Sequence, residues 1–305
     1  MKILVASDIA PDAITLLQEH FDVDVRTDLS EEELVAAIPG YDALVVRSKP
    51  RVPRSVIEAS SLSIIARAGV GLDNIDLAAC KERGIEVVNS PAALSESVAE
   101  LVFAMLLSFE RKIVRADNAM KEGLWLKKEL KGTEICNKTL GIIGFGRIGS
   151  HMAKIAAGFG MRVIAYDVHW NEDLAKGYDV EFWDLDLLYR EADYLSLHVP
   201  LLPSTKGMIS KRELGMMKKD AVLINTSRGG IVDEEALYNA LSAGTIRGAC
   251  LDVFEHEPPE DSPLLHLDNI IATPHIGAST REAQDKAGVI IAEQLIAWAQ
   301  KNRPV

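Results

Sequence analysis

The decisive stretch of this chain is TLGIIGFGRIGSHMAKIAAGFGMRVIAYD, residues 139–167. An apolar strand, 140–143, leads into a glycine motif that ends at Gly149. A helical pattern follows to about Phe159, and a second strand, 162–166, ends on Asp167. This order is typical of a dinucleotide-binding βαβ unit, which consists of a strand, a glycine turn, a helix and a second strand that ends on an acid.

Each glycine of the motif meets a separate steric requirement. Gly144 permits a tight turn, Gly146 lets the backbone approach a pyrophosphate, and Gly149 lets helix and strand pack closely. Arg147 and Ile148 open the helix, where free N–H groups and the positive end of the helix dipole face the phosphates. A glycine motif alone also fits an ordinary strand-to-helix turn, but the complete unit favours cofactor binding.

Asp167 predicts which dinucleotide binds. It lies 18 residues past Gly149, where a carboxylate accepts hydrogen bonds from the adenosine ribose. A 2′-phosphate would be repelled by this carboxylate. The sequence therefore predicts NAD rather than NADP as the cofactor.

Composition limits the class of protein. A chain of 305 residues exceeds what one hydrophobic core usually supports, so two domains are expected. The net charge of −12 argues against a nucleic-acid partner, and no apolar run is long enough to cross a membrane. The three cysteines form no metal-binding or disulfide pattern, and no signal peptide opens the chain. We expect a cytoplasmic protein without a bound metal.

Strands and helices alternate twice along the chain. The first alternation predicts strands at 2–6, 23–25, 43–46, 63–67 and 85–87, with helices between them. The second predicts six strands, at 140–143, 162–166, 194–197, 221–225, 248–251 and 270–272. We therefore expect an α/β fold of two doubly wound parallel-sheet domains. A Rossmann dinucleotide domain, 98–283, is inserted into a flavodoxin-like substrate-binding domain, 1–97 and 284–305.

A long apolar helix is expected to connect the two alternations. Its apolar positions run from Val98 to Ile113 with a period of 3.6 residues. Ser97 and Glu100 match a capping box, so the helix is predicted to begin at Ser97. A second helix is expected at about 281–301.

Three segments that follow predicted strands carry an arginine, a carboxylate and a histidine. These residues are Arg228, Glu257 and His275. Because the carboxyl ends of parallel strands border the ligand crevice, the three are expected to converge near the nicotinamide. Arg228 would hold a substrate carboxylate, His275 would exchange the hydroxyl proton, and Glu257 would orient the imidazole. Each residue taken singly has an ordinary structural explanation, but together they favour hydride transfer to and from a small hydroxy acid.

These motifs resemble those of the D-isomer-specific 2-hydroxyacid dehydrogenases. The segments that carry the resemblance are GIIGFGRIG with Asp167, HVPLLPSTKGMI, INTSRGGIVDEEAL, LDVFEHEPP and TPHIGAST. The resemblance implies Arg228, Glu257 and His275 as the catalytic residues, and a homodimer that acts on a small anionic 2-hydroxy or 2-keto acid. It implies cofactor contacts at Gly144, Gly146, Arg147, Ile148, Gly149, Asp167, Val199, Pro200, Thr226, Ser227, Asp252, His275, Gly277 and Ala278.

Two segments of the first domain are similar to those of family members that act on D-3-phosphoglycerate. The resemblance implies substrate contacts at Arg47, Arg67, Gly69, Val70 and Gly71, besides Arg228. Four positive residues and no acid lie between 47 and 54, an island that could attract a phosphorylated substrate. A solvated loop explains Lys49, Arg51 and Arg54 better, whereas for Arg47 a role in substrate binding is favoured. The expected reaction is the NAD-dependent interconversion of D-3-phosphoglycerate and 3-phosphohydroxypyruvate in serine biosynthesis, without a C-terminal regulatory domain.

Two alternatives stay open at the level of sequence. A glyoxylate or hydroxypyruvate reductase, or another D-2-hydroxyacid dehydrogenase, would use the same catalytic residues without a phosphate site. A non-enzymatic NAD(H)-sensing scaffold could retain the motifs as well, although this chain shows no extended disordered tails.

Overall fold

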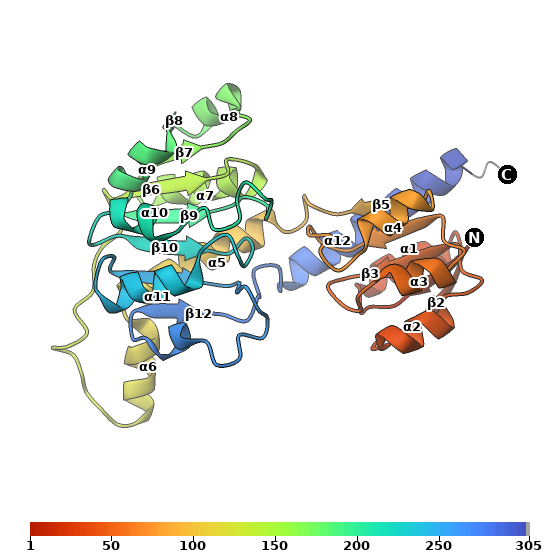
Figure 1. Cartoon of the computed structure of the whole chain (residues 1–305), viewed down its shortest axis with the longest axis horizontal. Helices are drawn as coiled ribbons and strands as arrows, with labels where there is room; N and C mark the ends of the chain where they lie inside the picture. The colour runs from red at the N-terminus through yellow and green to blue at the C-terminus, as the bar shows by residue number, and fades with distance from the viewer. Residues whose placement is uncertain (303–305) are drawn as a thin grey trace. The chain divides into compact units, whose positions relative to one another are not determined.

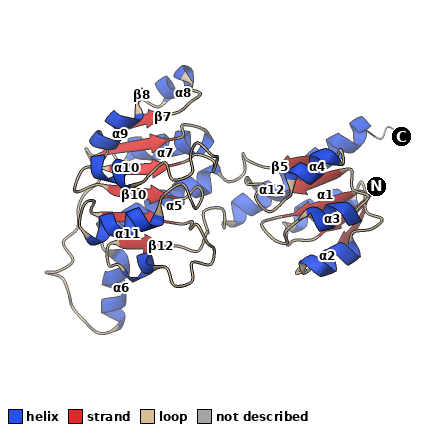
Figure 2. Cartoon of the chain, in the orientation of Figure 1, coloured by secondary structure: helices blue, strands red, loops and turns tan. Residues whose placement is uncertain are grey.

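The computed structural model describes residues 1–302 and contains two compact units. One unit comprises Met1–Ser97 together with the chain from Ala278 onward, and the other comprises Val98–Gly277. The second crossing between the units therefore lies ahead of the last helix, whereas the sequence expectation placed it at 283/284. Figure 2 shows that both units are built from strands enclosed by helices.

The first unit is a five-stranded parallel sheet in the order β2-β1-β3-β4-β5. This is the order of a flavodoxin-like sheet, as expected. Its strands are β1 (Lys2–Val5), β2 (Asp22–Val25), β3 (Ala43–Val46), β4 (Ile64–Arg67) and β5 (Glu86–Asn89). The helices of this unit are α1 (Pro11–Gln18), α2 (Glu31–Ala37), α3 (Arg54–Ala59), α4 (Leu77–Glu82) and α12 (Arg281–Asn302).

Both faces of this sheet are buried at its central strands, which is why β1, β3 and β4 are apolar without alternation. Ile3 and Val5 of β1 pack in the core under α1 and α12, and Leu4 packs in the core on the other face. Figure 1 shows α12, the last coloured helix, lying along the same unit as the N-terminus. The C-terminal helix thus completes the core of the first unit.

The second unit is a seven-stranded parallel sheet in the order β12-β11-β10-β9-β6-β7-β8. Its strands are β6 (Thr139–Ile143), β7 (Arg162–Tyr166), β8 (Val180–Phe182), β9 (Tyr194–Leu197), β10 (Val222–Asn225), β11 (Gly248–Leu251) and β12 (Ile270–Ala272). The chain runs outward from β6 to β8, returns to β9 on the other side of β6, and continues to β12. This reversal beside β6 is the switch point of a Rossmann fold, so the predicted fold class is confirmed.

The helices of the second unit enclose both faces of this sheet, with one hydrophobic core on each face. They are α5 (Ser95–Glu110), α6 (Ile113–Lys121), α7 (Arg147–Gly158), α8 (Glu172–Gly177), α9 (Leu185–Glu191), α10 (Lys211–Met216), α11 (Glu234–Ser242) and the 3₁₀ helix η1 (Pro263–His266). Among residues 1–302, no helix combines the length and apolar character needed to cross a bilayer.

Three details differ from the sequence expectation. The sheet has seven strands rather than six. The additional strand is β8, a three-residue edge strand with two exposed residues. The connecting helix α5 begins at Ser95, so Ser97 lies inside its first turn and does not cap it. It ends at Glu110 because Lys112 adopts a left-handed conformation with φ of 52°, which starts α6 and leaves Ile113 exposed.

Candidate functional site

The glycine motif forms the turn between β6 and α7. Gly144 has φ of 98°, and a Cβ at this position would collide with the carbonyl oxygen of His198, so only glycine fits. A Cβ at Gly149 would lie 2.7 Å from the carbonyl oxygen of Gly144, so helix and turn are in close contact there. A Cβ at Gly146 would meet no atom within 4 Å, so the backbone is open on that side.

This turn fits a pyrophosphate. Gly146 is the N-cap of α7 and has no side chain that could bind the first N–H groups of the helix. Those N–H groups therefore remain available to an anion at the positive end of the helix dipole. The open backbone at Gly146, with Arg147 and Ile148 beside it, gives the anion a path to them.

Asp167 is fixed at the end of β7 by backbone donors. Its Oδ2 accepts a hydrogen bond from the N–H of Phe145, and its Oδ1 accepts one from the N–H of His169, both at 2.8 Å. The two bonds tie the carboxylate to the glycine turn, and each oxygen keeps a further lone pair. Asp167 therefore keeps acceptor capacity beside the glycine turn, which a ribose contact would require.

The segment after β9 packs on the same turn. The N–H of His198 donates to Ile143 O at 2.7 Å, and Val199 lies over Gly144. The Nε2 atom of His198 lies 2.8 Å from Ser196 Oγ, while its Nδ1 is buried without a partner among the described residues. Burial lowers the pKa of His198 to about 3, so the ring is neutral. Pro200 follows at an exposed position.

The turn after β10 carries Thr226, Ser227 and Arg228. Asn225 holds it closed, since its Oδ1 accepts from both the N–H and the hydroxyl of Ser227, and its Nδ2 donates to Arg228 O at 2.9 Å. The buried hydroxyl of Thr226 has no hydrogen-bond partner within residues 1–302. A polar group in this state is costly unless a ligand satisfies it, which suits a cofactor contact. One Nη atom of Arg228 donates to Ser227 O at 2.7 Å.

Asp252 organises the turn that carries His275. This buried carboxylate accepts hydrogen bonds from Thr273 Oγ1 at 2.6 Å and from the N–H groups of Ile276 and Gly277 at 2.8 Å. The N–H of His275 donates to Asp252 O at 2.9 Å. His275 itself has φ of 54°, an unusual conformation for a residue other than glycine, and the surrounding bonds hold it there. Asp252, which the sequence assigned to cofactor binding, thus also supports the histidine.

Glu257 and His275 form a hydrogen-bonded pair. The Nδ1 atom of His275 lies 2.8 Å from Glu257 Oε2, and the N–H of Phe254 donates to Glu257 Oε1 at 3.2 Å. The carboxylate is therefore anchored on one oxygen and faces the imidazole with the other. Because Nδ1 is bound by the carboxylate, Nε2 is the ring nitrogen of His275 that this pair leaves for proton exchange.

The loop of Arg228 touches the loop of Glu257. A Cβ at Gly229 would collide with the carbonyl of Phe254 and lie 2.7 Å from the N–H nitrogen of Glu255. Arg228 and the pair of Glu257 and His275 therefore stand on loops in direct contact, at the carboxyl ends of the adjacent strands β10, β11 and β12.

The first unit holds the other predicted substrate residues. The N–H of Arg47 donates to Ser7 Oγ at 2.8 Å, and its carbonyl accepts from Asn74 Nδ2 at 2.9 Å, so the backbone is fixed on both sides. The guanidinium of Arg67 lies over Gly69, which has φ of 148° and leaves no space for a Cβ. Further along the same loop, Val70 is exposed and Gly71 is partly buried.

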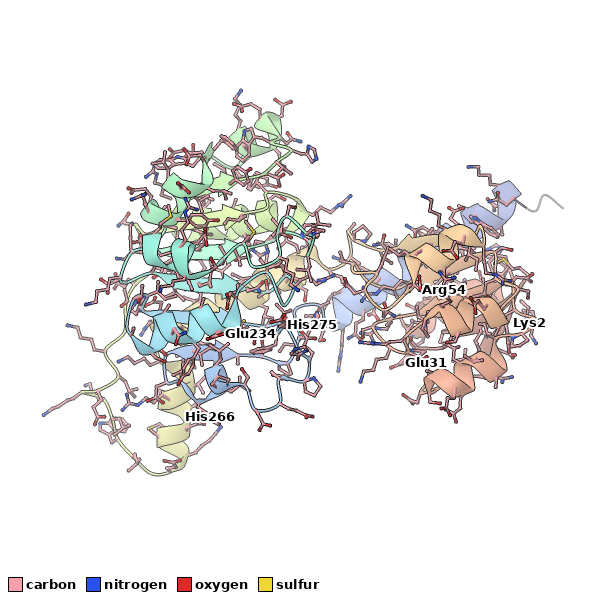
Figure 3. All side chains as sticks on the ribbon, in the orientation of Figure 1. Lys2, Glu31, Arg54, Glu234, His266 and His275 are labelled. Carbon is pink, nitrogen blue, oxygen red and sulfur yellow. The ribbon has the colours of Figure 1, made fainter. Side chains whose placement is uncertain are left out.

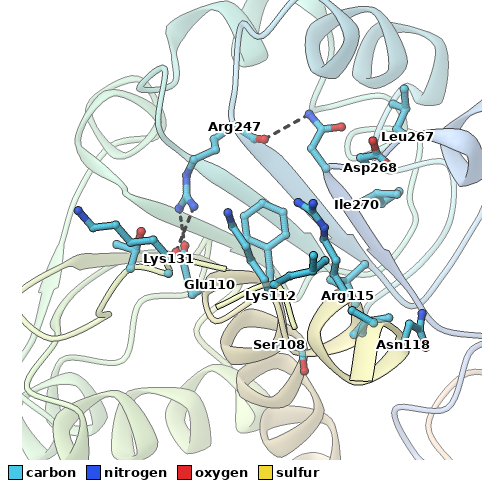
Figure 4. A pocket seen from close by; sticks show the side chains of 18 of the residues that line it. Ser108, Glu110, Lys112, Arg115, Asn118, Lys131, Arg247, Leu267, Asp268 and Ile270 are labelled. Atoms are coloured by element: carbon cyan, nitrogen blue, oxygen red, sulfur yellow. Dashed lines mark hydrogen bonds and ion pairs between the residues drawn. The ribbon is translucent and has the colours of Figure 1, made fainter. Parts of the chain in front are cut away.

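A separate pocket of about 1020 Å³ opens in the second unit (Figure 4). It is lined by the end of α5, by α6 and the segment after it, and by β12 with the residues before it. Glu110 is buried there and is held by Arg247, whose side chain also lies over Phe109. Sequence reasoning missed this pocket, and it contains none of the predicted catalytic or cofactor residues. Among residues 1–302, no cluster of three or more His, Cys, Asp or Glu is placed to hold a metal ion.

Comparison with known proteins adds independent observations. Residues 103–277 match the family model described as D-isomer specific 2-hydroxyacid dehydrogenase, NAD binding domain. The structure is similar to the crystal structure of D-lactate dehydrogenase from Aquifex aeolicus complexed with NAD and lactic acid. The TM-score is 0.85 at 30% identity, covering 99% of this chain and 96% of that one.

Two relatives are similar along nearly the whole chain. The D-3-phosphoglycerate dehydrogenase of Methanocaldococcus jannaschii is 50% identical over 297 residues, which are 97% of this chain and 57% of that protein. The hydroxypyruvate reductase of Thermotoga maritima is 49% identical over 290 residues, which are 93% of this chain and 94% of that protein. The chain therefore spans little more than half of the first relative and nearly all of the second.

Proposed function

The chain belongs to the D-isomer specific 2-hydroxyacid dehydrogenase family, and on that premise we propose that it interconverts D-3-phosphoglycerate and 3-phosphohydroxypyruvate. Residues 103–277 carry the NAD-binding domain of the family. The observation that carries the proposed chemistry is the 2.8 Å contact between Glu257 Oε2 and His275 Nδ1. The loop of Glu257 in turn touches the loop of Arg228.

Each of these three residues has a role in the proposed reaction. NAD, when bound, accepts the hydride from the hydroxyl-bearing carbon, and NADH returns it to the keto acid. His275 takes the hydroxyl proton in oxidation and gives it to the carbonyl oxygen in reduction. Glu257 fixes the orientation of the imidazole through its hydrogen bond to Nδ1. Arg228 binds the substrate carboxylate with two parallel N–H donors and so orients the carbonyl.

The proposed preference for a phosphorylated acid depends on the first unit. Arg47 and Arg67 would pair with phosphate oxygens, and the backbone of 69–71 would receive the carboxylate. Support comes from the relatives named D-3-phosphoglycerate dehydrogenase and from the fixed backbone of Arg47. Hydroxypyruvate reduction is the second candidate, because a relative with that name matches this chain over 94% of its own length.

The first experiment compares two keto acids. NADH oxidation by the purified protein is followed with 3-phosphohydroxypyruvate and, in parallel, with hydroxypyruvate. We expect a large kcat/KM advantage for the phosphorylated acid in the wild type, and loss of that advantage in Arg47→Gln. Arg51→Gln, an exposed neighbour in the same loop, is the matched control. Equal or reversed preference would move the assignment to hydroxypyruvate.

We also propose that the protein is a homodimer that pairs through the second unit. Apolar side chains are exposed on α6 and on the segment after it, and Trp125 is 76% exposed. The pocket in Figure 4 lies beside these side chains. Pairing of two copies through this region would bury apolar surface of both protomers. Sedimentation velocity should show a dimer for the wild type and a weakened one for Trp125→Ser. A wild-type monomer at micromolar concentration would refute the proposal.

A further inference from the structure

The backbone of Phe254 and Glu255 contacts the loop of Arg228 and the helix α11. The N–H of Phe254 donates to Glu257, and its carbonyl faces Gly229 in the loop of Arg228. The next N–H, that of Glu255, donates to Glu234 Oε1 at 2.6 Å. A displacement of these two residues would therefore move the anchor of Glu257 and the packing of the Arg228 loop together.

Glu234 reaches this peptide from α11. It is the first residue of that helix, but Asp233 already caps it by accepting from the N–H of Ala236 at 2.9 Å. The carboxylate of Glu234 is thus not needed as a cap and instead binds a different loop. Glu235, the next acid in the same turn, is exposed and has no role in this contact between α11 and the loop 254–257.

The position of Glu234 is costly for a carboxylate. Its side chain is half-buried, and burial is the main cause that raises the pKa of Glu234, with the nearby charge of Glu255 adding to it. The hydrogen bond from the Glu255 N–H and the proximity of His256 act in the opposite direction. A carboxylate that only interacted with the helix dipole would be more stable when exposed to solvent, as the carboxylate of Glu235 is.

We propose that Glu234 is a positioning residue for the pair of Glu257 and His275. By holding the N–H of Glu255 it fixes the backbone beside Phe254, whose own N–H anchors Glu257, and so keeps the carboxylate within hydrogen-bond distance of the imidazole. This inference rests on the proposed function of Glu257 and His275. Figure 3 labels Glu234 and His275, which lie in different segments of the chain and are linked through the loop 254–257.

The test compares Glu234→Ala and Glu234→Gln with Glu235→Ala as the matched control. Glu234→Ala should lower kcat for keto-acid reduction by on the order of 10- to 100-fold, as small misplacements of catalytic groups do. Its NADH affinity, measured by fluorescence titration, should stay at the wild-type value. Glu234→Gln keeps an oxygen that accepts from the Glu255 N–H, so it should retain most of kcat.

Rescue by Glu234→Gln separates positioning from a general structural effect. Glu234→Gln and Glu234→Ala both remove the charge, but only Glu234→Gln keeps an acceptor for the N–H of Glu255, so kcat should differ between the two variants. Glu235→Ala should leave kcat unchanged.

Several outcomes would overturn the inference. One is a kcat in Glu234→Ala equal to that of Glu235→Ala, and another is an equally large loss of kcat in Glu234→Gln. If Glu234→Ala does not fold, Glu234→Met is tested in its place, because it keeps the volume and removes the acceptor. Failure of both variants to fold would show that Glu234 is required for folding and would also overturn the inference. Absence of wild-type turnover with either keto acid would instead refute the proposed function.

Discussion

His275 combines a strained backbone with the geometry of a general acid and base. A residue with a side chain rarely adopts φ of 54° without surrounding support, and here the turn is held by three donors to the buried carboxylate of Asp252. Strain of this kind is found where a side chain must point in one direction. We interpret the Asp252 contacts as the source of that direction for His275.

Replacing the imidazole should remove catalysis and leave the cofactor site intact. His275→Ala should lower kcat for keto-acid reduction by on the order of 10²–10⁴, the usual contribution of a positioned acid or base. NADH binding should be weakened far less than kcat, because His275 is one predicted cofactor contact among many and the glycine motif and Asp167 lie on other elements. Steady-state kinetics and NADH fluorescence titration check the two parts. Nearly full turnover in the variant would show that the proton is exchanged elsewhere.

Gly229 is a residue whose only apparent role is to have no side chain. Gly229→Ala should force the Arg228 loop away from the carbonyl of Phe254, because the added Cβ collides with backbone that cannot rotate away. We expect a loss of about 1–3 kcal/mol in unfolding free energy, the usual cost of overpacking. Gly158→Ala, at a helical position where a Cβ meets nothing within 4 Å, is the control and should be neutral or stabilising. Chemical denaturation measures both, and equal stabilities would show that the loop adapts freely.

At the scale of elements, apolar strands were predictable and the charged edge strand β8 was not. All six expected strands of the second sheet are present, since each is a predominantly apolar run. The seventh, β8, is three residues long and carries the exposed, charged Glu181, so no apolar pattern marks it. The end of α5 depends on the backbone of Lys112 alone, and lysine gives no sequence signal for a left-handed conformation.

The candidate site follows the same division. Residues that stand directly after strands were predictable, because topology brings the ends of parallel strands to one edge. Contacts between distant segments were not predictable, so sequence reasoning assigned no role to Glu234 and predicted only a cofactor contact for Asp252. Their roles depend on backbone N–H groups of distant loops, whose positions no spacing in the sequence specifies.

The end of β9 leads to a prediction about pH. His198 is neutral when folded, with its pKa lowered to about 3 by burial, whereas in the unfolded chain it titrates near 6.5. Below about pH 6.5 the unfolded state therefore binds a proton that the folded state does not, and stability is lost as pH falls toward 3. From pH 7 to pH 5 the titration of His198 should lower the free energy of unfolding by about 2 kcal/mol, since one group contributes at most about 1.4 kcal/mol per pH unit.

Removing the titrating ring should remove that dependence. The difference in unfolding free energy between wild type and His198→Gln should shift in favour of the variant by about 2 kcal/mol from pH 7 to pH 5. Urea denaturation of both proteins at the two pH values measures it. Parallel stability curves would show that His198 is accessible to protons in the folded state.

At the scale of the whole molecule, each unit has its own pair of hydrophobic cores. The cores of the first unit are formed by 3–94 and the residues of α12, and those of the second by residues between 99 and 264. Because the second unit is one continuous segment while the first is built from both ends of the chain, only the second can be produced alone as a simple fragment.

The isolated fragment 98–277 should fold and bind NADH. It contains both cores of its sheet, the glycine motif, Asp167 and the 273–277 turn, so it has the apolar burial and the cofactor contacts of the intact chain. It should not turn over keto acids, because Arg47, Arg67 and the loop 69–71 belong to the other unit. Circular dichroism, NADH fluorescence titration and an NADH oxidation assay test the three statements. An unfolded fragment would mean that its cores require the first unit, and turnover at the wild-type rate would place all substrate contacts in the second unit and refute the proposed roles of Arg47 and Arg67.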